Sequence, residues 1–411
     1  MMKFSPVLLR YTFRVALSAF LLQGIAPNVR AGSLSYTIID LGGLGGVSNT
    51  GFVSEAFGVN ATGQVVGDSV LSNGDLSAFR TGPGGQPINN LGGSSSTAFA
   101  INDSGQSAGQ STFAGTLSAF RTDPNGSITS GSNLGLLPGG SFSIGQGINA
   151  SGQVVGSGDT STANGTEIHA FRTTSTGGLN AASDLGVLSG MNGSQAFGIN
   201  NSGQAVGNSF NTSTGAELAF RADPGAAMKS LGLLSGGTFS SAAAINSSAM
   251  VVGNADTSSA AEVAYRTTAG GDLSTATILG FLSGGSFSSA LGINDLGWVV
   301  GVGDTSTSSQ DAWVWNGSGS LVDLNNVLVN GQGWNLFSAT GINDAGDIVG
   351  TGELNGQTDA FLLIPVPEPG TLIMAWTSVV VGLVLAWRRR RATTHMHPIG
   401  GRAAGVCGTL G

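Results

Sequence analysis

The side chains that could do chemistry in this chain are carboxylates set among serine, threonine, asparagine and glycine. They fall in segments that we expect to join the second and third strands of a repeated unit. These acids are Asp68, Asp75, Asp159, Glu167, Glu217, Asp256, Glu262, Asp304, Asp311, Glu353 and Asp359. Clustered carboxylates and hydroxyls can bind Ca²⁺ or the hydroxyl groups of a sugar. We predict Asp159, Asp256 and Asp304 as the residues that contact a ligand, if the loops contact one.

A catalytic site does not stand out among these acids. Glycan cleavage needs a paired acid and base, and repeated acids single out neither. The sequence holds no Asp-x-Asp-x-Asp-Gly calcium loop with a distal Glu, no His-Glu-x-x-His zinc motif and no phosphate-binding loop. We therefore predict no catalytic residue, no cofactor and no metal ion, and a solvated polar face is the simpler interpretation of the acids.

An asparagine recurs at one turn position. Its copies, 42 to 51 residues apart, are Asn60, Asn102, Asn149, Asn200, Asn246, Asn294 and Asn343. An asparagine side chain can bond the backbone two residues further on, and a glycine three residues later takes the positive φ that closes such a loop. Seven copies at one position indicate turn closure rather than a ligand site.

Arginine and histidine are the other side chains in the repeats that could have a function. The repeated arginines are Arg80, Arg121, Arg172, Arg221 and Arg266. They could form a ring of anion sites, but we expect them to pair with Asp or Glu on an acidic surface. His169 is the only histidine between residues 32 and 365. Because the sequence places no partner beside it, we expect a surface or packed residue rather than a general base.

The elements that position these residues repeat with the same period. Short apolar runs flank each asparagine, and an Ala-aromatic pair and a Leu, usually before Gly, follow in every unit. The aromatics are Phe79, Phe120, Phe171, Phe220, Tyr265, Trp313 and Phe361, and the leucines are Leu41, Leu91, Leu134, Leu185, Leu231, Leu279 and Leu324. A period of 40 to 50 residues built from short strands is typical of propeller blades or solenoid rungs. Each unit therefore holds four short strands.

Composition agrees with an all-β protein. The chain has 411 residues, 69 glycines and only 9% charged residues, which favours many tight turns between uncharged strands. Residues 32–365 carry 22 acids against 6 bases, so this region repels nucleic acid. The single cysteine, Cys407, lies outside the repeats, so no disulfide can hold the fold.

The register of the repeats indicates how their ends meet. The chain enters the repeats with a Leu-type strand at residues 36–41 and leaves with an aromatic-type strand at residues 360–363. If the first strand completes the last unit, no free edge remains. We therefore predict a seven-bladed β-propeller with four-stranded blades over residues 32–365, with an open β-solenoid as the alternative. In this register the small residues of the asparagine strand line the axis.

Both ends of the chain carry export signals. Residues 1–31 have basic residues ahead of an apolar run and small residues before a cleavage point, which predicts a secretory signal peptide. Residues 366–391 contain Pro367, Glu368 and Pro369, then an apolar run at 372–387 and four arginines, which predicts one transmembrane helix with the arginines on the cytoplasmic side. Residues 392–411 are predicted to be a disordered tail.

Two resemblances follow from these patterns. The Leu-Gly, Gly-Ile-Asn and Gly-Gln-Val-Val-Gly elements across residues 36–363 resemble the HAF family of probable extracellular repeats, whose name matches His169-Ala170-Phe171. Six of the seven units lack this histidine. Residues 366–391 resemble a PEP-CTERM sorting signal, although a tail follows the arginines that usually end such chains. That resemblance implies processing by an exosortase near Pro367, Glu368 and Pro369 in an exopolysaccharide-producing Gram-negative bacterium.

Together these features predict an exported protein of the cell envelope, cell surface or extracellular matrix, with a precursor held in the inner membrane. We expect a non-catalytic structural or binding module associated with exopolysaccharide, biofilm or surface proteins. The alternative is an extracellular hydrolase or lyase that acts on polysaccharide. Function on a repeated scaffold lies in the loops rather than in the fold.

Overall fold

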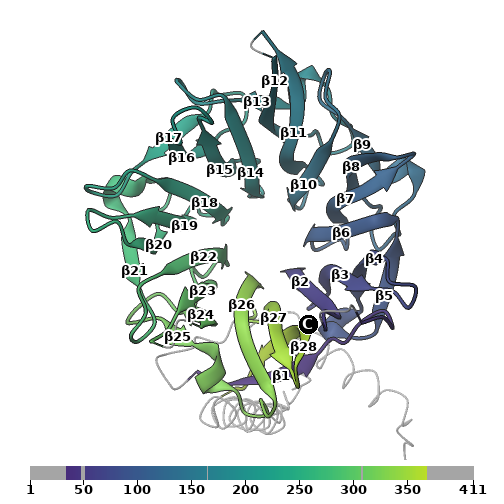
Figure 1. Cartoon of the computed structure of the whole chain (residues 1–411), viewed down its shortest axis with the longest axis vertical. Coiled ribbons are helices and arrows are strands. Elements are labelled where there is room, and N and C mark those ends of the chain that lie inside the picture. Colours follow the sequence, from purple (N-terminus) through teal and green to yellow (C-terminus); the bar gives the residue numbers. More distant parts are fainter. Residues whose placement is uncertain (1–33, 48–50, 164, 307–308, 368–411) are drawn as a thin grey trace, which may run out of the picture. The chain divides into compact units, whose positions relative to one another are not determined.

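The computed structural model describes residues 34–47, 51–163, 165–306 and 309–367. Residues 34–365 form one compact unit of seven four-stranded antiparallel sheets, arranged as blades around an axis (Figure 1). The predicted propeller with four-stranded blades is therefore confirmed, and the solenoid alternative is wrong. No helix within the described ranges is long and apolar enough to cross a membrane. The predicted signal peptide, transmembrane helix and tail lie outside them.

The first four blades follow the chain without interruption. Blade 1 contains β2 (Ser54–Val59), β3 (Val65–Val70), β4 (Leu76–Thr81) and β5 (Ile88–Gly92). Blade 2 contains β6 (Ser94–Ile101), β7 (Ser107–Phe113), β8 (Thr116–Arg121) and β9 (Asn133–Gly135). Blade 3 contains β10 (Ser143–Ile148), β11 (Val154–Thr162), β12 (Gly165–Arg172) and β13 (Asp184–Gly186). Blade 4 contains β14 (Gly193–Ile199), β15 (Ala205–Phe210), β16 (Glu217–Ala222) and β17 (Lys229–Gly232).

The last three blades complete the ring. Blade 5 contains β18 (Ser240–Ile245), β19 (Val251–Asp256), β20 (Glu262–Arg266) and β21 (Thr277–Gly280). Blade 6 contains β22 (Ser288–Ile293), β23 (Val299–Asp304), β24 (Gln310–Trp315) and β25 (Val322–Asp323). Blade 7 contains β26 (Trp334–Ile342), β27 (Ile348–Leu354), β28 (Gln357–Pro365) and, from the other end of the chain, β1 (Tyr36–Asp40). Short 3₁₀ helices η1 to η5 cover Pro83–Gly85, Ser130–Ser132, Ala181–Ser183, Leu273–Thr275 and Leu324–Val327.

The closing pair is antiparallel, as the register of the repeats predicts. Ile38 lies opposite Leu363, and Asp40 lies opposite Phe361. The N–H of Leu41 continues the ladder by donating to the carbonyl of Ala360 at 3.1 Å. Ile38 and Leu41 are buried in two separate clusters, each of which also contains side chains of β27 and β28, so the two ends of the repeat region hold each other.

The core lies between neighbouring blades. One cluster, for example, joins Val66 and Leu91 of blade 1 to Ile101 and Phe120 of blade 2. The seven third-strand aromatics are all fully buried, as expected for the widening wedge between blades. This repeated packing replaces a single central core, as in other propeller architectures.

Glycine in the second strand is required by the innermost strand. The asparagine strand bulges between Ala56 and Gly58, and the bulge brings the carbonyl oxygen of Glu55 against Gly67. A Cβ on Gly67 would collide with that oxygen and lie 2.8 Å from the ring of Phe79. The same register shift and the same glycine recur in the other blades, which explains the repeated Val-Gly step.

Candidate functional site

The repeated asparagines close their turns, which confirms the prediction. In blade 4 the Oδ1 of Asn200 accepts hydrogen bonds from the N–H of Ser202 at 3.1 Å and of Gln204 at 3.0 Å. Asn200 is only 4% exposed. Its carbonyl also accepts from the N–H of Gly203, so the turn leaves few unpaired polar groups.

The amide nitrogen of each repeated asparagine links neighbouring blades, which was not predicted from the sequence. The Nδ2 of every repeated asparagine donates to the backbone carbonyl of the equivalent asparagine in the next blade, at 3.0 to 3.2 Å. The bond from Asn343 to Asn60 closes the circle across 283 residues. We call these seven residues the asparagine ring. A signal was present, because Asp or Ser would close such a turn equally well but lacks the amide donor.

Serines form a second set of links between blades, also missed from sequence. In six blades a fully buried serine near the start of the innermost strand bonds the preceding blade. Ser240, for example, accepts from the N–H of Ala219 at 2.9 Å and donates to the carbonyl of Gly232 at 2.7 Å. These residues are Ser54, Ser96, Ser143, Ser194, Ser240 and Ser288. Blade 7 has Leu336 at this position, and Asn325 of η5 bonds both backbone groups of Leu336 instead.

The predicted surface ion pairs of the arginines are wrong for four of the five residues. Arg121, Arg172 and Arg266 each donate to the carbonyl of the glycine in the next blade's asparagine turn, at 2.7 to 2.8 Å, and Arg80 does so at 3.1 Å. Burial lowers the pKa of these four guanidinium groups. These arginines bond backbone carbonyls rather than surface carboxylates because the carbonyls lie at a fixed position beside each partly buried guanidinium group. Within the described ranges only Arg221 pairs with an acid, Asp223, at 3.3 Å.

Asp159, Asp256 and Asp304 lie at equivalent places but not in free loops. Asp159 lies within β11, and the other two end β19 and β23. Each carboxylate accepts from two backbone N–H groups and one hydroxyl of the connection that leads into its own blade. Burial alone would raise the pKa of these carboxyls, but the hydrogen bonds outweigh it and hold each pKa below its usual value.

His169 is packed, as expected, but it has partners that the sequence did not reveal. Its Nδ1 lies 2.9 Å from Oδ2 of Asp184 on the neighbouring strand, and its Nε2 lies 3.7 Å from Oε2 of Glu167. The hydrogen bond to Asp184 raises the pKa of His169, against the effect of burial. His169 is only 8% exposed, its Nδ1 is bonded to Asp184, and its Nε2 is buried without a hydrogen-bond partner in the described part of the chain, so the ring is poorly placed to act as a base on a polymer.

One catalytic pattern in the sequence does not form a catalytic structure. Gly105-Gln106-Ser107-Ala108-Gly109 matches the Gly-x-Ser-x-Gly spacing of a nucleophile elbow. Such a nucleophile must stand exposed on a strand-to-helix turn. Ser107 is instead fully buried at the start of β7, in the middle of a blade.

A carboxylate pair in the inner strands of blade 1 consists of the buried Asp68 and the half-buried Glu55. Asp68 of β3 lies opposite Glu55 of β2, and its Oδ2 accepts from the hydroxyl of Thr97 at 2.8 Å. Its Oδ1 has no hydrogen-bond partner within the described ranges. Burial, and then the charge of Glu55, raise the pKa of Asp68 to about 7.

A hollow of about 190 Å³ opens at the asparagine ring. Its walls are the isoleucines that precede the ring asparagines, and its rim includes the residues that follow them, such as Asp103, Asn201, Ser247 and Asp295. Several rim side chains bond the preceding blade, as when Asp295 accepts from the N–H of Ser247 at 2.8 Å. Outside the lining of the hollow, Asp344 accepts from the N–H of Asp295 in the same way. Burial raises the pKa of Asp344, and the charges of Asp295 and Asp103 add to this effect.

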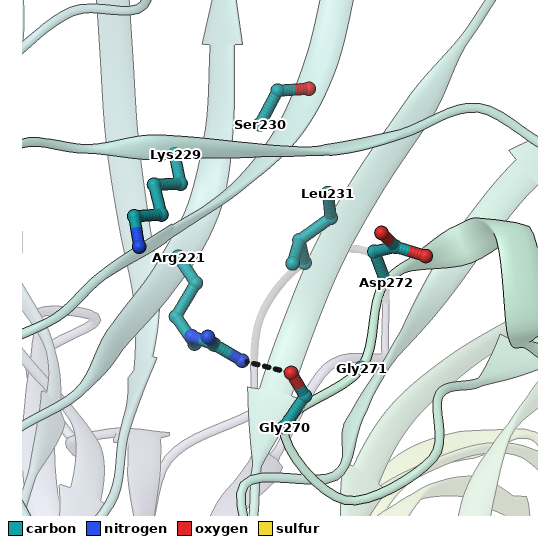
Figure 2. Close-up of a pocket in the computed structure, with 7 residues that line it drawn as sticks. All are labelled: Arg221, Lys229, Ser230, Leu231, Gly270, Gly271 and Asp272. Carbon is teal, nitrogen blue, oxygen red and sulfur yellow. Dashed lines mark hydrogen bonds between the residues drawn. The ribbon is translucent and has the colours of Figure 1, made fainter.

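A second hollow, of about 160 Å³, lies between blades 4 and 5. Arg221 and Lys229 line one side, and Gly270 and Gly271 line the other (Figure 2). The Nη1 of Arg221 donates to the carbonyl of Gly270 at 3.0 Å. This hollow was not predicted, although Lys229 is the only lysine between residues 32 and 365. Across the ranges that the structure covers, no group of three His, Cys, Asp or Glu side chains is placed to hold a metal ion.

This architecture defines the class of the protein as a seven-bladed β-propeller. No family model and no curated protein matches the chain. Among solved structures, a prolyl endopeptidase is similar at 11% identity with a TM-score of 0.50, over 89% of this chain and 56% of that one. A lectin of Aleuria aurantia (15% identity, TM-score 0.35, 67% of this chain and 98% of that one) and a sialidase of Trypanosoma rangeli (9%, 0.34, 89% and 61%) also match. At these identities the likeness supports the fold alone.

Proposed function

We propose that this protein is an exported propeller that binds or organises extracellular polysaccharide without changing it. The observation that carries the proposal is the use of the repeated polar side chains. The recurring amides and hydroxyls, and the guanidinium groups of four blades, bond turns or neighbouring blades, and His169 is bonded to Asp184. Side chains fixed in this way build a rigid disc rather than a reaction centre.

Contact with a polymer is expected at the exposed groups that remain. The rim of the axial hollow presents Asp103, Asn201 and Asp295 to solvent, and each uses only its Oδ1 for the hydrogen bond to the preceding blade. The predicted ligand contacts Asp159, Asp256 and Asp304 stay a proposal. Because their carboxylates fix the connections between blades, neutralising them would disturb those connections whether or not a ligand is present.

The sorting prediction is part of the same proposal. An exported chain with a PEP-CTERM signal would be held in the inner membrane by residues 372–387 and processed by an exosortase. Of the predicted sorting signal, residues 366–391, only Val366 and Pro367 fall within the described residues. We expect that replacing Pro367, Glu368 and Pro369 with alanine leaves a longer, membrane-retained form on fractionation. Release of that variant at the wild-type mass would show that the sorting assignment is wrong.

The alternative function is an enzyme that acts on extracellular polysaccharide. The raised pKa of Asp68, opposite Glu55, favours it, because a general acid must hold its proton near neutral pH. Against it, Asp68 is only 6% exposed.

One experiment separates the two. The purified repeat region, residues 34–365, is incubated with matrix polysaccharide, and both retention and chain length are measured. We expect retention with unchanged chain length. Polysaccharide that is shortened by the wild type but keeps its length with Asp68→Asn would establish the enzyme. No retention of the polysaccharide would leave only a structural role.

A further inference from the structure

Arg221 departs from the pattern of the other four repeated arginines. Those four reach the glycine of the next blade's asparagine turn, whereas the equivalent residue in blade 5 is Ala249. Arg221 donates instead to Gly270 alone, and its Nε lies 3.3 Å from Asp223 without an aligned hydrogen bond. The remaining guanidinium donors have no partner within the described ranges.

Lys229 stands directly opposite Arg221 on the neighbouring strand. The residues at this place in blades 1 and 5 are neutral, because Asn89 faces Arg80 and Thr277 faces Arg266. Lys229 is exposed, and nothing in the described part of the chain bonds its ammonium group. Like charges that face each other across a strand pair destabilise the sheet, so an anion placed between them would relieve that repulsion.

The two nearby acids, Asp223 and Asp272, do not fully neutralise the charges of Arg221 and Lys229. Asp223 is shared, since it also accepts from Nε2 of Gln204. The carboxylate of Asp272 accepts from the N–H and hydroxyl of Ser274, where it caps η4. In Figure 2 the carboxylate of Asp272 lies beyond Leu231, away from the two cationic side chains.

We propose that this hollow between blades 4 and 5 binds a carboxylate, namely that of a uronic-acid unit in extracellular polysaccharide. The inference rests on the proposed polysaccharide function and names the sugar that it recognises. A guanidinium group binds a carboxylate through parallel hydrogen bonds, and the adjacent ammonium adds a third donor.

The charge of the whole region restricts the choice of anion. Residues 32–365 carry 22 acids and 6 bases, so a densely charged polymer is repelled as it approaches. A carboxylate on an otherwise uncharged sugar meets less repulsion and finds two cations at short range. The volume of about 160 Å³ suits one sugar unit rather than an extended chain.

The test measures binding of single sugars to the full-length protein by ligand-observed NMR and calorimetry. Glucuronate is compared with glucose, which has the same ring without the carboxylate, and with inorganic sulfate. We expect glucuronate to bind, and glucose and sulfate to bind at least tenfold more weakly. Equal binding of glucose, or of sulfate, would overturn the assignment to a uronic acid.

Two variants locate the site. Lys229→Gln removes an exposed charge without disturbing a bond, and should weaken glucuronate binding about tenfold while the melting temperature stays the same or rises slightly, because the repulsion from Arg221 is removed. Arg266→Gln is the matched control, because it removes an equivalent arginine that lacks a facing lysine, and its glucuronate affinity should equal that of the wild type. Unchanged affinity in Lys229→Gln would contradict the proposal.

The outcomes also separate this inference from the proposed function. Polysaccharide retention that persists in a protein with no Lys229-dependent glucuronate binding would overturn the site and leave the function standing. Glucuronate binding that depends on Lys229, without retention of any polymer, would support the site and contradict the function.

Discussion

The asparagine ring at the axis and the polar side-chain pair at the outer edge of each blade differ in how far their contacts reach. At the axis, each ring asparagine bonds its own turn and the next blade, so seven blades carry the same residue. At the outer edge, the residue before the Ala-aromatic pair meets the residue before the Leu, within one blade. These pairs differ: Ser77 with Asn90, His169 with Asp184, Asp311 with Asp323 and Asp359 with Asp40.

The difference shows what holds a repeat constant. A residue that bonds two blades cannot change without disturbing both, whereas a pair within one blade can change together. In blade 7 the outer pair is two acids, and burial, followed by the charge of Asp40, raises the pKa of Asp359 to about 6. The outer edge, and the clefts beside it, are therefore where individual blades acquire separate properties.

The largest expected effect comes from opening the ring. Deleting residues 38–41 removes β1 from blade 7 together with the buried side chains Ile38 and Leu41. Each such side chain contributes about 2 to 5 kcal/mol, so we expect a loss of more than about 5 kcal/mol in urea unfolding. Hydrogen exchange should lose protection first at Leu362, which lies opposite Ile39 and whose N–H group faces the missing strand. Unchanged stability would contradict closure by the two chain ends.

A smaller effect is expected at the asparagine ring. Asn200→Ala leaves the N–H groups of Ser202 and Gln204 and the carbonyl of Asn246 without their partner, and should cost about 2 to 4 kcal/mol. The control is Asn90→Ala at the exposed outer edge, which should cost less than about 1 kcal/mol. Equal losses in the two variants would remove the distinction between the inner and outer strands.

Much of the fold could be predicted because repetition multiplies weak signals. One turn asparagine is ambiguous, but seven in register fixed the blade, the strand order and the pairing of residues 36–41 with 360–363. The partners of Arg80, Asp159 and His169 could not be predicted in the same way. Their contacts are backbone groups or side chains in another blade or strand, and sequence spacing carries no distance between such groups. The hollow at Lys229 could not be predicted either, because its distinguishing feature is that Arg221 does not bond the asparagine turn of the next blade as the other four arginines do.

The carboxylate pair of Asp68 and Glu55 in blade 1 tests whether an acid that no other blade carries at this position lowers stability. Asp68 has a pKa of about 7 in the folded protein, above the usual value for an acid, so the folded state holds its proton more tightly. Stability from this group is therefore present below about pH 4 and is lost as the pH rises to about 7. Asp68→Asn removes this loss. The free energy of unfolding of the variant, relative to that of the wild type, should therefore increase by about 2 kcal/mol between pH 5.5 and 8. A constant difference across this range would show that Asp68 does not titrate there.

The smallest expected effect concerns His169, where the outer edge of blade 3 carries a pair found in no other blade. The hydrogen bond to Asp184 raises the pKa of His169 above its usual 6.5, so the protonated form is favoured in the folded state. The stabilisation is then fully present below pH 6.5 and is lost as the pH rises through the folded pKa. His169→Gln should therefore be less stable than the wild type by up to about 1 kcal/mol at pH 5.5, and the difference should shrink by pH 9.

Ser118→Ala, at the equivalent position of blade 2, is the control, since a hydroxyl gives no pH dependence in this range. Because residues 34–365 contain one histidine, its titration can be followed by NMR without ambiguity. A pKa below 6.5 would mean that burial outweighs Asp184, and that this outer pair adds no charge-dependent stability to blade 3.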